Sequence, residues 1–291
     1  MRLSEPDRRL PDPKQKKEQG KISVLPRRQF LILAAGTAAL LAGCAPAVSE
    51  AEQSLPQIVV GCDNYPPFNT VGTSSGYAGI DVELAREAFH RLGYEPVFQL
   101  IKWEEKDALL ESGEIDCVWS CFGMQDRKGE YRWAGPYMTS REVVAVLPES
   151  DIRTLADLAG RSVAVQSATH QEQIFLHPEE DPRIPEVQMV FTMEDRELLY
   201  PLLGKGYVDA VASHDLVVLQ FMKDYGVEYR ILDEALETAE LGVAFAKDNT
   251  SNLPQMLDNT LSAMQQDGTI RSILARYVDD PDALLEVSTR A

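Results

Sequence analysis

Short apolar runs alternate with amphipathic stretches from Leu55 to the end of the chain, and this alternation constrains the fold more than any other feature. Runs such as 58–60 and 162–166 have the apolar, β-branched content of buried strands. Stretches such as 81–92 place apolar residues at helical spacing, with Asp81 as the predicted N-cap. Parallel strands need such helical connections, so the sequence predicts an α/β fold with parallel-type sheets flanked by helices.

The same pattern restarts after Ser150, which indicates two lobes of similar construction. In open α/β sheets, ligands bind beyond the carboxyl ends of the strands, where loops meet the N-termini of helices. We therefore expect the ligand contacts to lie in five loops, which follow Gly61, Leu100, Ser120, Gln166 and Ala212.

The stretch 27–44 has the three-part layout of an export signal. Two arginines precede an uncharged apolar run, which ends at Leu41-Ala42-Gly43-Cys44. The run from Phe30 to Gly43 has 14 residues, fewer than the ~20 that a helix needs to cross a bilayer. Its ending resembles the bacterial lipobox, in which the cysteine is lipidated and becomes the new N-terminus. An uncleaved anchor or a buried apolar helix is the alternative interpretation.

The export signal defines the N-terminal segments of the chain. We expect residues 1–43 to be a signal peptide that is removed, Cys44 to carry the lipid, and residues 44–55 to form a tether. The paired arginines resemble a twin-arginine signal, and the general secretory route stays open as well. The protein is then expected to work outside the cytoplasm, anchored to a membrane by its N-terminal lipid.

The charge of the mature chain limits its partners. Residues 1–43 hold nine of the 28 basic and four of the 46 acidic residues, so the remainder carries a net charge of −23. Such a charge argues against nucleic acid as a partner and against attachment to anionic lipid through the protein surface. The remaining 248 residues are enough for a sizeable core.

Three cysteines, Cys62, Cys117 and Cys121, remain once Cys44 is assigned to the lipid. They form no CxxC pair and no Cys/His cluster with metal-ligand spacing, so the sequence predicts no metal site and no cofactor. Cys117 and Cys121 lie about 13 Å apart on a predicted strand, which is too far for a disulfide. A disulfide from Cys62 to either of them stays open.

Two of the selected loops offer groups that bind a carboxylate. Arg127 can grip a carboxylate through two parallel hydrogen bonds. The helix that begins at Ala168 and Thr169 can take the same carboxylate through its free N–H groups. The alternatives are that Arg127 is a solvated surface arginine and that Thr169 is only a helix N-cap.

The other loops offer aromatic and acidic groups. Tyr65 and Trp103 can stack on a side chain or on a cation, or they are simply core aromatics. Asp63 or Asp215 can pair with an ammonium group. An α-amino acid presents the groups that this set and the carboxylate-binding set would recognise.

Several segments of the chain resemble, in order and spacing, the family-3 extracellular solute-binding proteins, which are periplasmic amino-acid-binding proteins of ABC transporters. The resemblance covers nearly all of residues 56–280. The segments are VGCDNYPPF (60–68), GIDVELA (79–85), LESGEID (110–116), AGPY (134–137), LADLAG (155–160), VAVQ (163–166), VDA (208–210) and MQQDGT (264–269).

The resemblance implies a periplasmic-binding-protein-like type II fold, in which two lobes close on the ligand about two hinge crossovers. It places lobe I in residues 56–143 and 243–291, with the C-terminal helices in the second part, and lobe II in residues 144–242. The hinges are expected near Arg141 to Val144 and Leu241 to Val243.

The resemblance also assigns site residues. Tyr65 matches the stacking aromatic of the first loop, and Trp103, thirteen residues before Asp116, matches the second. Arg127 matches the carboxylate arginine, because it stands seven residues after the small residue Ser120. Thr169 matches the threonine at the helix start.

Two positions depart from the pattern of the family. Phe122 stands where a serine or threonine is usual, and His214 stands where the aspartate that binds the ammonium is usual, with Asp215 one position later. The ammonium contact could therefore come from His214, Asp215 or Asp63, or the ligand could be an unusual amino acid.

We expect a monomeric, non-catalytic receptor that captures an amino acid or a related small polar compound and delivers it to an ABC permease. One alternative is a ligand-sensing module for a membrane signalling partner. The other is a cyclohexadienyl dehydratase-like enzyme on the same fold, with His214, Asp215 or Glu172 as the general acid.

Overall fold

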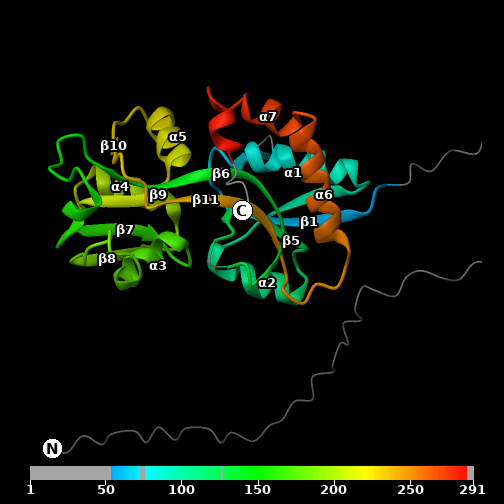
Figure 1. The fold of residues 1–291 in the computed structure, drawn as a ribbon, viewed down its shortest axis with the longest axis horizontal. Helices are drawn as coiled ribbons and strands as arrows, with labels where there is room; N and C mark the ends of the chain where they lie inside the picture. The colour runs from blue at the N-terminus through cyan, green and yellow to red at the C-terminus, as the bar shows by residue number, and fades with distance from the viewer. Residues whose placement is uncertain (1–53, 73–75, 126, 287–291) are drawn as a thin grey trace, which may run out of the picture. The chain divides into compact units, whose positions relative to one another are not determined.

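A mixed β-sheet runs through the described part of the chain, with helices packed beside it (Figure 1). The structure is a computed structural model that describes residues 54–72, 76–125 and 127–286. The described residues all belong to one compact unit. The predicted signal peptide, the lipidated Cys44 and most of the tether lie outside the described residues.

Nine strands form the main sheet, in the order β4-β1-β5-β11-β6-β9-β7-β8, with β10 paired to β6. Two further short strands, β2 and β3, form a separate hairpin that the sequence analysis missed. The strands are β1 (Gln57–Cys62), β2 (Thr70–Gly72), β3 (Gly76–Ala78), β4 (Glu95–Leu100), β5 (Cys117–Gly123), β6 (Arg132–Val146), β7 (Ser162–Gln166), β8 (Met189–Met193), β9 (Ala210–His214), β10 (Arg230–Ile231) and β11 (Glu237–Phe245).

The helices fall close to the amphipathic stretches of the sequence. The α-helices are α1 (Ile80–Arg91), α2 (Lys106–Ser112), α3 (His170–Leu176), α4 (Leu199–Gly204), α5 (Asp215–Tyr225), α6 (Leu253–Gln266) and α7 (Thr269–Leu274). The 3₁₀ helices are η1 (Trp103–Glu105), η2 (Leu155–Leu158), η3 (Pro178–Glu180), η4 (Arg196–Leu198) and η5 (Asp282–Leu284). Within the described ranges, no helix has both the length and the apolar character that a membrane span requires.

Two lobes share this sheet. We call lobe I the part with β1, β4, β5, α1, α2, α6 and α7, and lobe II the part with β7, β8, β9, α3, α4 and α5. Strands β6 and β11 run from one lobe to the other, as Figure 1 shows. They pair along their length, for example Glu237 with Glu142 and Leu241 with Met138.

The expected parallel pairing holds within each lobe and fails at the two connecting strands. Strand β1 is parallel to β4 and β5, and β7 is parallel to β8 and β9. Strand β11 is antiparallel to β5 and β6, and β6 is antiparallel to β9. The reason is that β6 carries the chain directly from lobe I to lobe II, so the strand that returns beside it must run in the opposite direction.

The N-terminus of α1 holds the first of the predicted ligand loops in place. The N–H groups of Ile80 and Asp81 donate to the carbonyl oxygens of Pro67 and Phe68, each at 3.0 Å. The prediction of Asp81 as the N-cap is wrong, because Gly79 precedes the helix. Asp81 is instead buried in the first helical turn, where its carboxylate accepts from the Cys121 N–H at 2.6 Å.

The burial of Asp81 predicts a pH-dependent stability. Burial raises the pKa of the Asp81 carboxyl to about 7, although hydrogen bonds from Cys121, Tyr137 and Asn69 oppose the shift. The folded protein then keeps a proton that the unfolded chain releases near pH ~4. We expect the free energy of unfolding, measured by urea denaturation, to fall as the pH rises from about 4 through about 7.

The variant Asp81→Asn should lack this pH dependence, because an amide does not titrate in this range. Asp248→Asn, which changes an exposed carboxylate, serves as the matched control and should keep the wild-type slope. An unchanged slope in Asp81→Asn would contradict the assignment.

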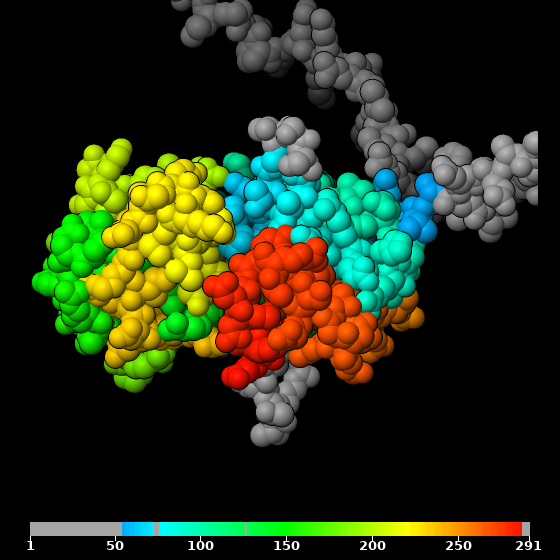
Figure 2. All heavy atoms as spheres, turned by 90° about the horizontal axis from the view of Figure 1, so that it is seen from above, coloured from blue at the N-terminus to red at the C-terminus, as the bar shows by residue number. Residues whose placement is uncertain are grey.

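The C-terminal residues pack against the connecting strands. The Thr139 hydroxyl of β6 donates to the Leu284 carbonyl at 3.2 Å. Figure 2 shows the C-terminal residues (red) at the surface beside α6 (orange) and α5 (yellow). The described C-terminal segment therefore contacts a strand that both lobes share.

All three described cysteines are free thiols. Cys62, Cys117 and Cys121 are buried and unpaired. The disulfide from Cys62 that the sequence left open is therefore not formed in this structure. Burial raises the pKa of each thiol, so the reactive thiolate form is disfavoured.

Candidate functional site

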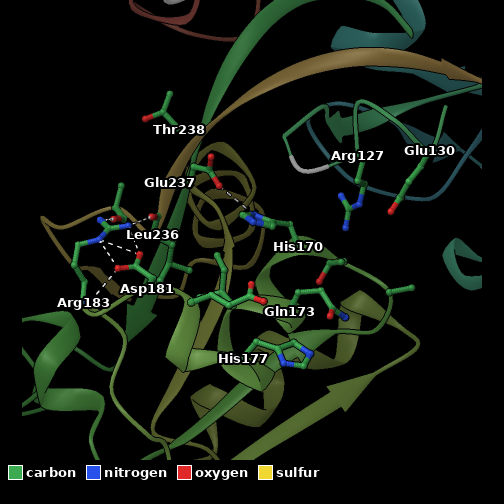
Figure 3. Close-up of a pocket in the computed structure, with 15 residues that line it drawn as sticks. Arg127, Glu130, His170, Gln173, His177, Asp181, Arg183, Leu236, Glu237 and Thr238 are labelled. Carbon is green, nitrogen blue, oxygen red and sulfur yellow. Dashed lines mark hydrogen bonds and ion pairs between the residues drawn. The ribbon is translucent and has the colours of Figure 1, made fainter. Parts of the chain in front are cut away.

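A cavity of about 980 Å³ is lined by residues of both lobes. Arg127 of lobe I lies on one side, and Thr169 and His170 at the start of α3 lie on the other. Glu237 and Thr238 of β11 complete the wall near the connecting strands. Figure 3 shows Arg127 and His170 directed toward this space. The structure thus brings Arg127 and the start of α3 to one cavity, although they are about forty residues apart in the sequence.

The start of α3 is already partly occupied by the chain's own groups. Thr169 is the N-cap, and its hydroxyl oxygen accepts from the Glu172 N–H at 3.3 Å. The Ala168 N–H, which the sequence offered to a ligand carboxylate, donates to the Glu172 carboxylate at 2.8 Å. Ala168 lines the cavity, but its N–H is not available to a ligand in this arrangement.

The other end of the cavity is acidic. His170 Nδ1 lies 2.8 Å from Glu142 Oε2 and 3.4 Å from Glu237 Oε2. Burial lowers the pKa of His170. The hydrogen bond to Glu142 and the charges of both carboxylates raise this pKa by more than burial lowers it, so the net shift is upward. Glu142 on β6 and Glu237 on β11 are distant from His170 in the sequence, so no local pattern indicates this pairing.

Glu142, His170 and Glu237 lie close enough together to hold a cation. Their candidate ligand atoms lie within 4.8 Å of one another. The sequence predicted no metal site, since neither His nor Cys spacing indicated one. Both carboxylates already pair with His170, and an ammonium group would suit the same two carboxylates.

A second group of predicted residues gathers around the first loop. Asp63 is buried, and its carboxylate accepts from the Ser120 hydroxyl at 2.7 Å. The Tyr65 hydroxyl lies 3.0 Å from the Ser213 hydroxyl of lobe II. The Trp103 indole N–H donates to the Ala168 carbonyl of lobe II at 3.0 Å. The two aromatic residues therefore bridge the lobes rather than lining the large cavity.

Arg196 occupies the centre of this second group, and sequence reasoning missed it. Its guanidinium carbon lies 3.4 Å from the centroid of the Tyr65 ring and 5.6 Å from that of Trp103. Its Nε lies 2.9 Å from Asp63 Oδ2. In the sequence Arg196 stands between Asp195 and Glu197, where a solvated charged turn is the ordinary interpretation, so no local signal identified it.

His214 and Asp215 are not among the residues that line the two cavities beside Arg127 and Arg196, so their predicted contact with the ligand stays a prediction. Strand β9 ends at His214 and α5 begins at Asp215, so the predicted loop between them is absent. His214 is buried with Nδ1 at 2.9 Å from the Ser140 hydroxyl, and burial lowers its pKa to about 4. The Asp215 carboxylate accepts from the Leu216 N–H at 2.7 Å.

Phe122, which stands where the family usually has a serine or threonine, has a packing role in the structure. Its ring packs edge-on against Trp103, Tyr131 and Trp133. The guanidinium carbon of Arg127 lies 5.3 Å from the Phe122 centroid, which orients the arginine without consuming its N–H groups. An aromatic side chain thus supports Arg127 where a hydroxyl was expected to contact the ligand directly.

The comparisons with known proteins agree with this architecture. The model of the bacterial extracellular solute-binding proteins, family 3, matches residues 58–280. The chain belongs to this family. Among family-3 relatives, the L-cystine-binding protein TcyJ of Escherichia coli (strain K12) is 30% identical over 76% of this chain and 82% of its own length. The arginine-binding extracellular protein ArtP of Bacillus subtilis (strain 168) is 27% identical over 85% of this chain and 96% of its own.

Solved structures confirm the type II fold of this family-3 protein. The crystal structure of Tv2483 bound to L-arginine superposes with a TM-score of 0.70 at 27% identity, covering 77% of this chain and 91% of that one. The expected α/β class with two lobes and two connecting strands is therefore confirmed. The exact residue boundaries of the lobes and hinges stay predictions.

Proposed function

We propose that this family-3 protein is an extracytoplasmic receptor that binds an amino acid, or a related small zwitterion, between its lobes. One observation carries the proposal: a single cavity has Arg127 of lobe I on one side and Glu237, with His170 and Glu142 behind it, on the other. A carboxylate pairs with the guanidinium, and an ammonium group pairs with the acidic end. The names of the relatives TcyJ and ArtP, which bind L-cystine and arginine, support an amino acid as the ligand.

In this proposal Glu237 replaces His214, Asp215 and Asp63 as the partner of the ammonium group. His214 is buried against Ser140, and Asp63 is engaged by Arg196 and Ser120. Glu237 is half-buried and lines the cavity directly. An ammonium group at this wall of the cavity would share the Glu237 carboxylate with His170, which lies 3.4 Å from it.

We further propose that the receptor delivers its ligand to an ABC permease and that Cys44 anchors it by lipid beside that permease. The support is the lipobox-like end of the export signal and the membership of family 3. A tether of about eleven residues would keep the lobes within about 40 Å of the membrane surface at full extension. Confinement to that layer raises the chance of meeting a membrane partner.

The structure offers less support for a dehydratase-like enzyme. A general acid must reach the leaving group of the substrate. Of the three candidates, Glu172 bonds to the Ala168 backbone, Asp215 bonds to the Leu216 backbone, and His214 is buried beside Ser140. None of these carboxyl or imidazole groups is placed over the cavity between the lobes.

A thermal-shift screen of the purified protein against all amino acids and common derivatives tests the proposal. A ligand present at 100 times its Kd adds about 2.7 kcal/mol to the free energy of unfolding. For a domain of this size we expect a rise in Tm of about 5–10 °C. A screen in which no zwitterionic compound gives a saturable shift would contradict the proposed function.

A further inference from the structure

The chain builds a site for a planar cation and fills it with its own side chain. We call this site the box. It consists of the Tyr65 ring, the Trp103 ring and the buried carboxylate of Asp63, all from lobe I. The occupant, Arg196, comes from η4 of lobe II. Its side chain is only 11% exposed, so the guanidinium is largely withdrawn from water.

The surroundings of the box require a positive charge. A cavity of about 360 Å³ beside it is lined by five carboxylates and two cations, namely Asp63, Glu104, Glu194, Asp195, Glu197, Lys102 and Arg196. Loss of Arg196 would leave the Asp63 carboxylate buried with other acids near it. A buried, uncompensated carboxylate is strongly unfavourable, so such a site attracts an external cation.

The fit of Arg196 in the box is incomplete. Its Nε lies 2.9 Å from Asp63 Oδ2, yet the N–H finds no acceptor in hydrogen-bonding geometry. Stacking on Tyr65 and charge attraction therefore hold the side chain, without the two parallel hydrogen bonds that arginine and carboxylate can form. A guanidinium that is not attached to η4 can approach Asp63 with better geometry.

The box adjoins the wall of the ligand cavity, because the Trp103 indole N–H donates to the carbonyl of Ala168, which lines that cavity. We propose that Arg196 fills the place that a cationic ligand side chain would take in this box, and that it makes the receptor reject amino acids with such side chains. A guanidinium or ammonium side chain would have to displace Arg196 from the stacked position on Tyr65 and from Asp63. A neutral or acidic side chain does not compete for this box. The inference rests on the proposed function, and it narrows the ligand class to amino acids without a side-chain cation.

Removal of the occupant should convert the box into a binding site for arginine. In Arg196→Ala we expect saturable binding of L-arginine, with an affinity about a hundredfold or more above that of the wild type. Methylguanidinium, which lacks the α-amino acid groups, should also raise the Tm of this variant at millimolar concentration. Both effects should disappear in the double variant Arg196→Ala/Asp63→Asn, because the carboxylate that pairs with the cation is lost.

Two controls separate this effect from a general response to lost charge. Arg196→Lys keeps a cation in the box and should still reject arginine. Arg161→Ala removes another arginine of lobe II, one that pairs with the exposed Asp151 at 2.7 Å and lines neither cavity, and should show no saturable response to methylguanidinium. If Arg196→Ala does not fold, Arg196→Gln keeps most of the side-chain stem, loses the charge, and carries the same test.

The outcomes distinguish this inference from the proposed function. Wild-type protein that binds L-arginine as tightly as Arg196→Ala overturns the role of Arg196 and leaves the receptor function intact. A folded Arg196→Ala protein with no saturable response to either cation also overturns it. Methylguanidinium could raise the Tm of Arg196→Ala although the wild type binds no amino acid. That result would support the role of Arg196 as built-in occupant and would contradict the proposed receptor function.

Discussion

Arg127→Ala should raise the Kd for the ligand found in the screen at least about a hundredfold. Arg127 is the cation that lobe I contributes to the cavity between the lobes, and its guanidinium is oriented by the ring of Phe122. Truncation of one partner of a hydrogen-bonded charge pair costs about 2–5 kcal/mol when the pair is desolvated. The ligand carboxylate would lose its partner in a closed cleft, where water cannot replace the lost hydrogen bonds.

The same substitution should leave the ligand-free protein almost as stable as the wild type. Arg127 is partly exposed, and surface changes of this kind usually alter the free energy of unfolding by no more than about 0.5 kcal/mol. Isothermal titration calorimetry gives the Kd, and thermal unfolding without ligand gives the Tm.

Lys128→Ala is the matched control for Arg127→Ala, because Lys128 is the next residue and an exposed cation. Its amine lies 3.8 Å from Glu240 and not in the wall of the cavity. We expect ligand affinity close to that of the wild type in this variant. Equal affinities in Arg127→Ala and the wild type would contradict the assignment of Arg127 as the partner of the ligand carboxylate.

Gly79→Ala should lower the free energy of unfolding by about 3 kcal/mol or more. Gly79 has φ 122° and ψ 176°, a backbone region that is essentially restricted to glycine. A Cβ at this position would lie 2.3 Å from the Phe68 carbonyl oxygen and 2.7 Å from that of Pro67. Both contacts are with backbone, so a change of rotamer cannot relieve them.

The effect of Gly79→Ala should extend to ligand binding. The turn at Gly79 lets the first N–H groups of α1 reach the carbonyls of Pro67 and Phe68, and this contact fixes the loop that carries Asp63 and Tyr65. In thermal unfolding we expect the Tm to fall by about 6–12 °C. We also expect weaker ligand binding in whatever protein remains folded.

Gly93→Ala is the comparison that isolates the backbone clash. Gly93 also has a positive φ, 78°, but a Cβ there would meet no atom within 4 Å. Gly93→Ala should lower the free energy of unfolding by only about 1 kcal/mol, because the left-handed backbone conformation is the only unfavourable feature. Equal losses of stability in the two variants would mean that the close approach to Pro67 and Phe68 contributes little.

Local signals in the sequence were enough for most of the elements. Apolar periodicity and helix stops predicted β1, β7, α1 and α3 within a few residues, because these elements are specified by contacts with their own neighbours in the chain. The expectation failed at β6 and β11. Their antiparallel pairing depends on a direct passage of the chain between lobes, and the strand pattern alone does not reveal which direction a strand takes.

Some residues of the candidate site could likewise be selected from the sequence, and others could not. Arg127, Tyr65, Trp103 and Thr169 could be selected because each follows a strand or starts a helix at a recognisable spacing. Arg196 could not, since its partners Asp63 and Tyr65 lie more than 130 residues away and its immediate neighbours are acidic. Glu142 and Glu237 were missed because strand residues next to a hinge give no loop signal.

The sequence by itself determined the class of the fold, the family and the kinds of chemical group available at the ends of the strands. Short-range patterns and motif spacing are sufficient for these, because they reflect the local geometry of the backbone. Only the tertiary structure decided which charges meet. It placed Arg127 across a cavity from Glu237, buried His214 beside Ser140, and put Arg196 onto Tyr65 and Asp63. Those pairings depend on how the two lobes approach each other, and the energy of a charge depends on its neighbours in space rather than on its neighbours in the chain.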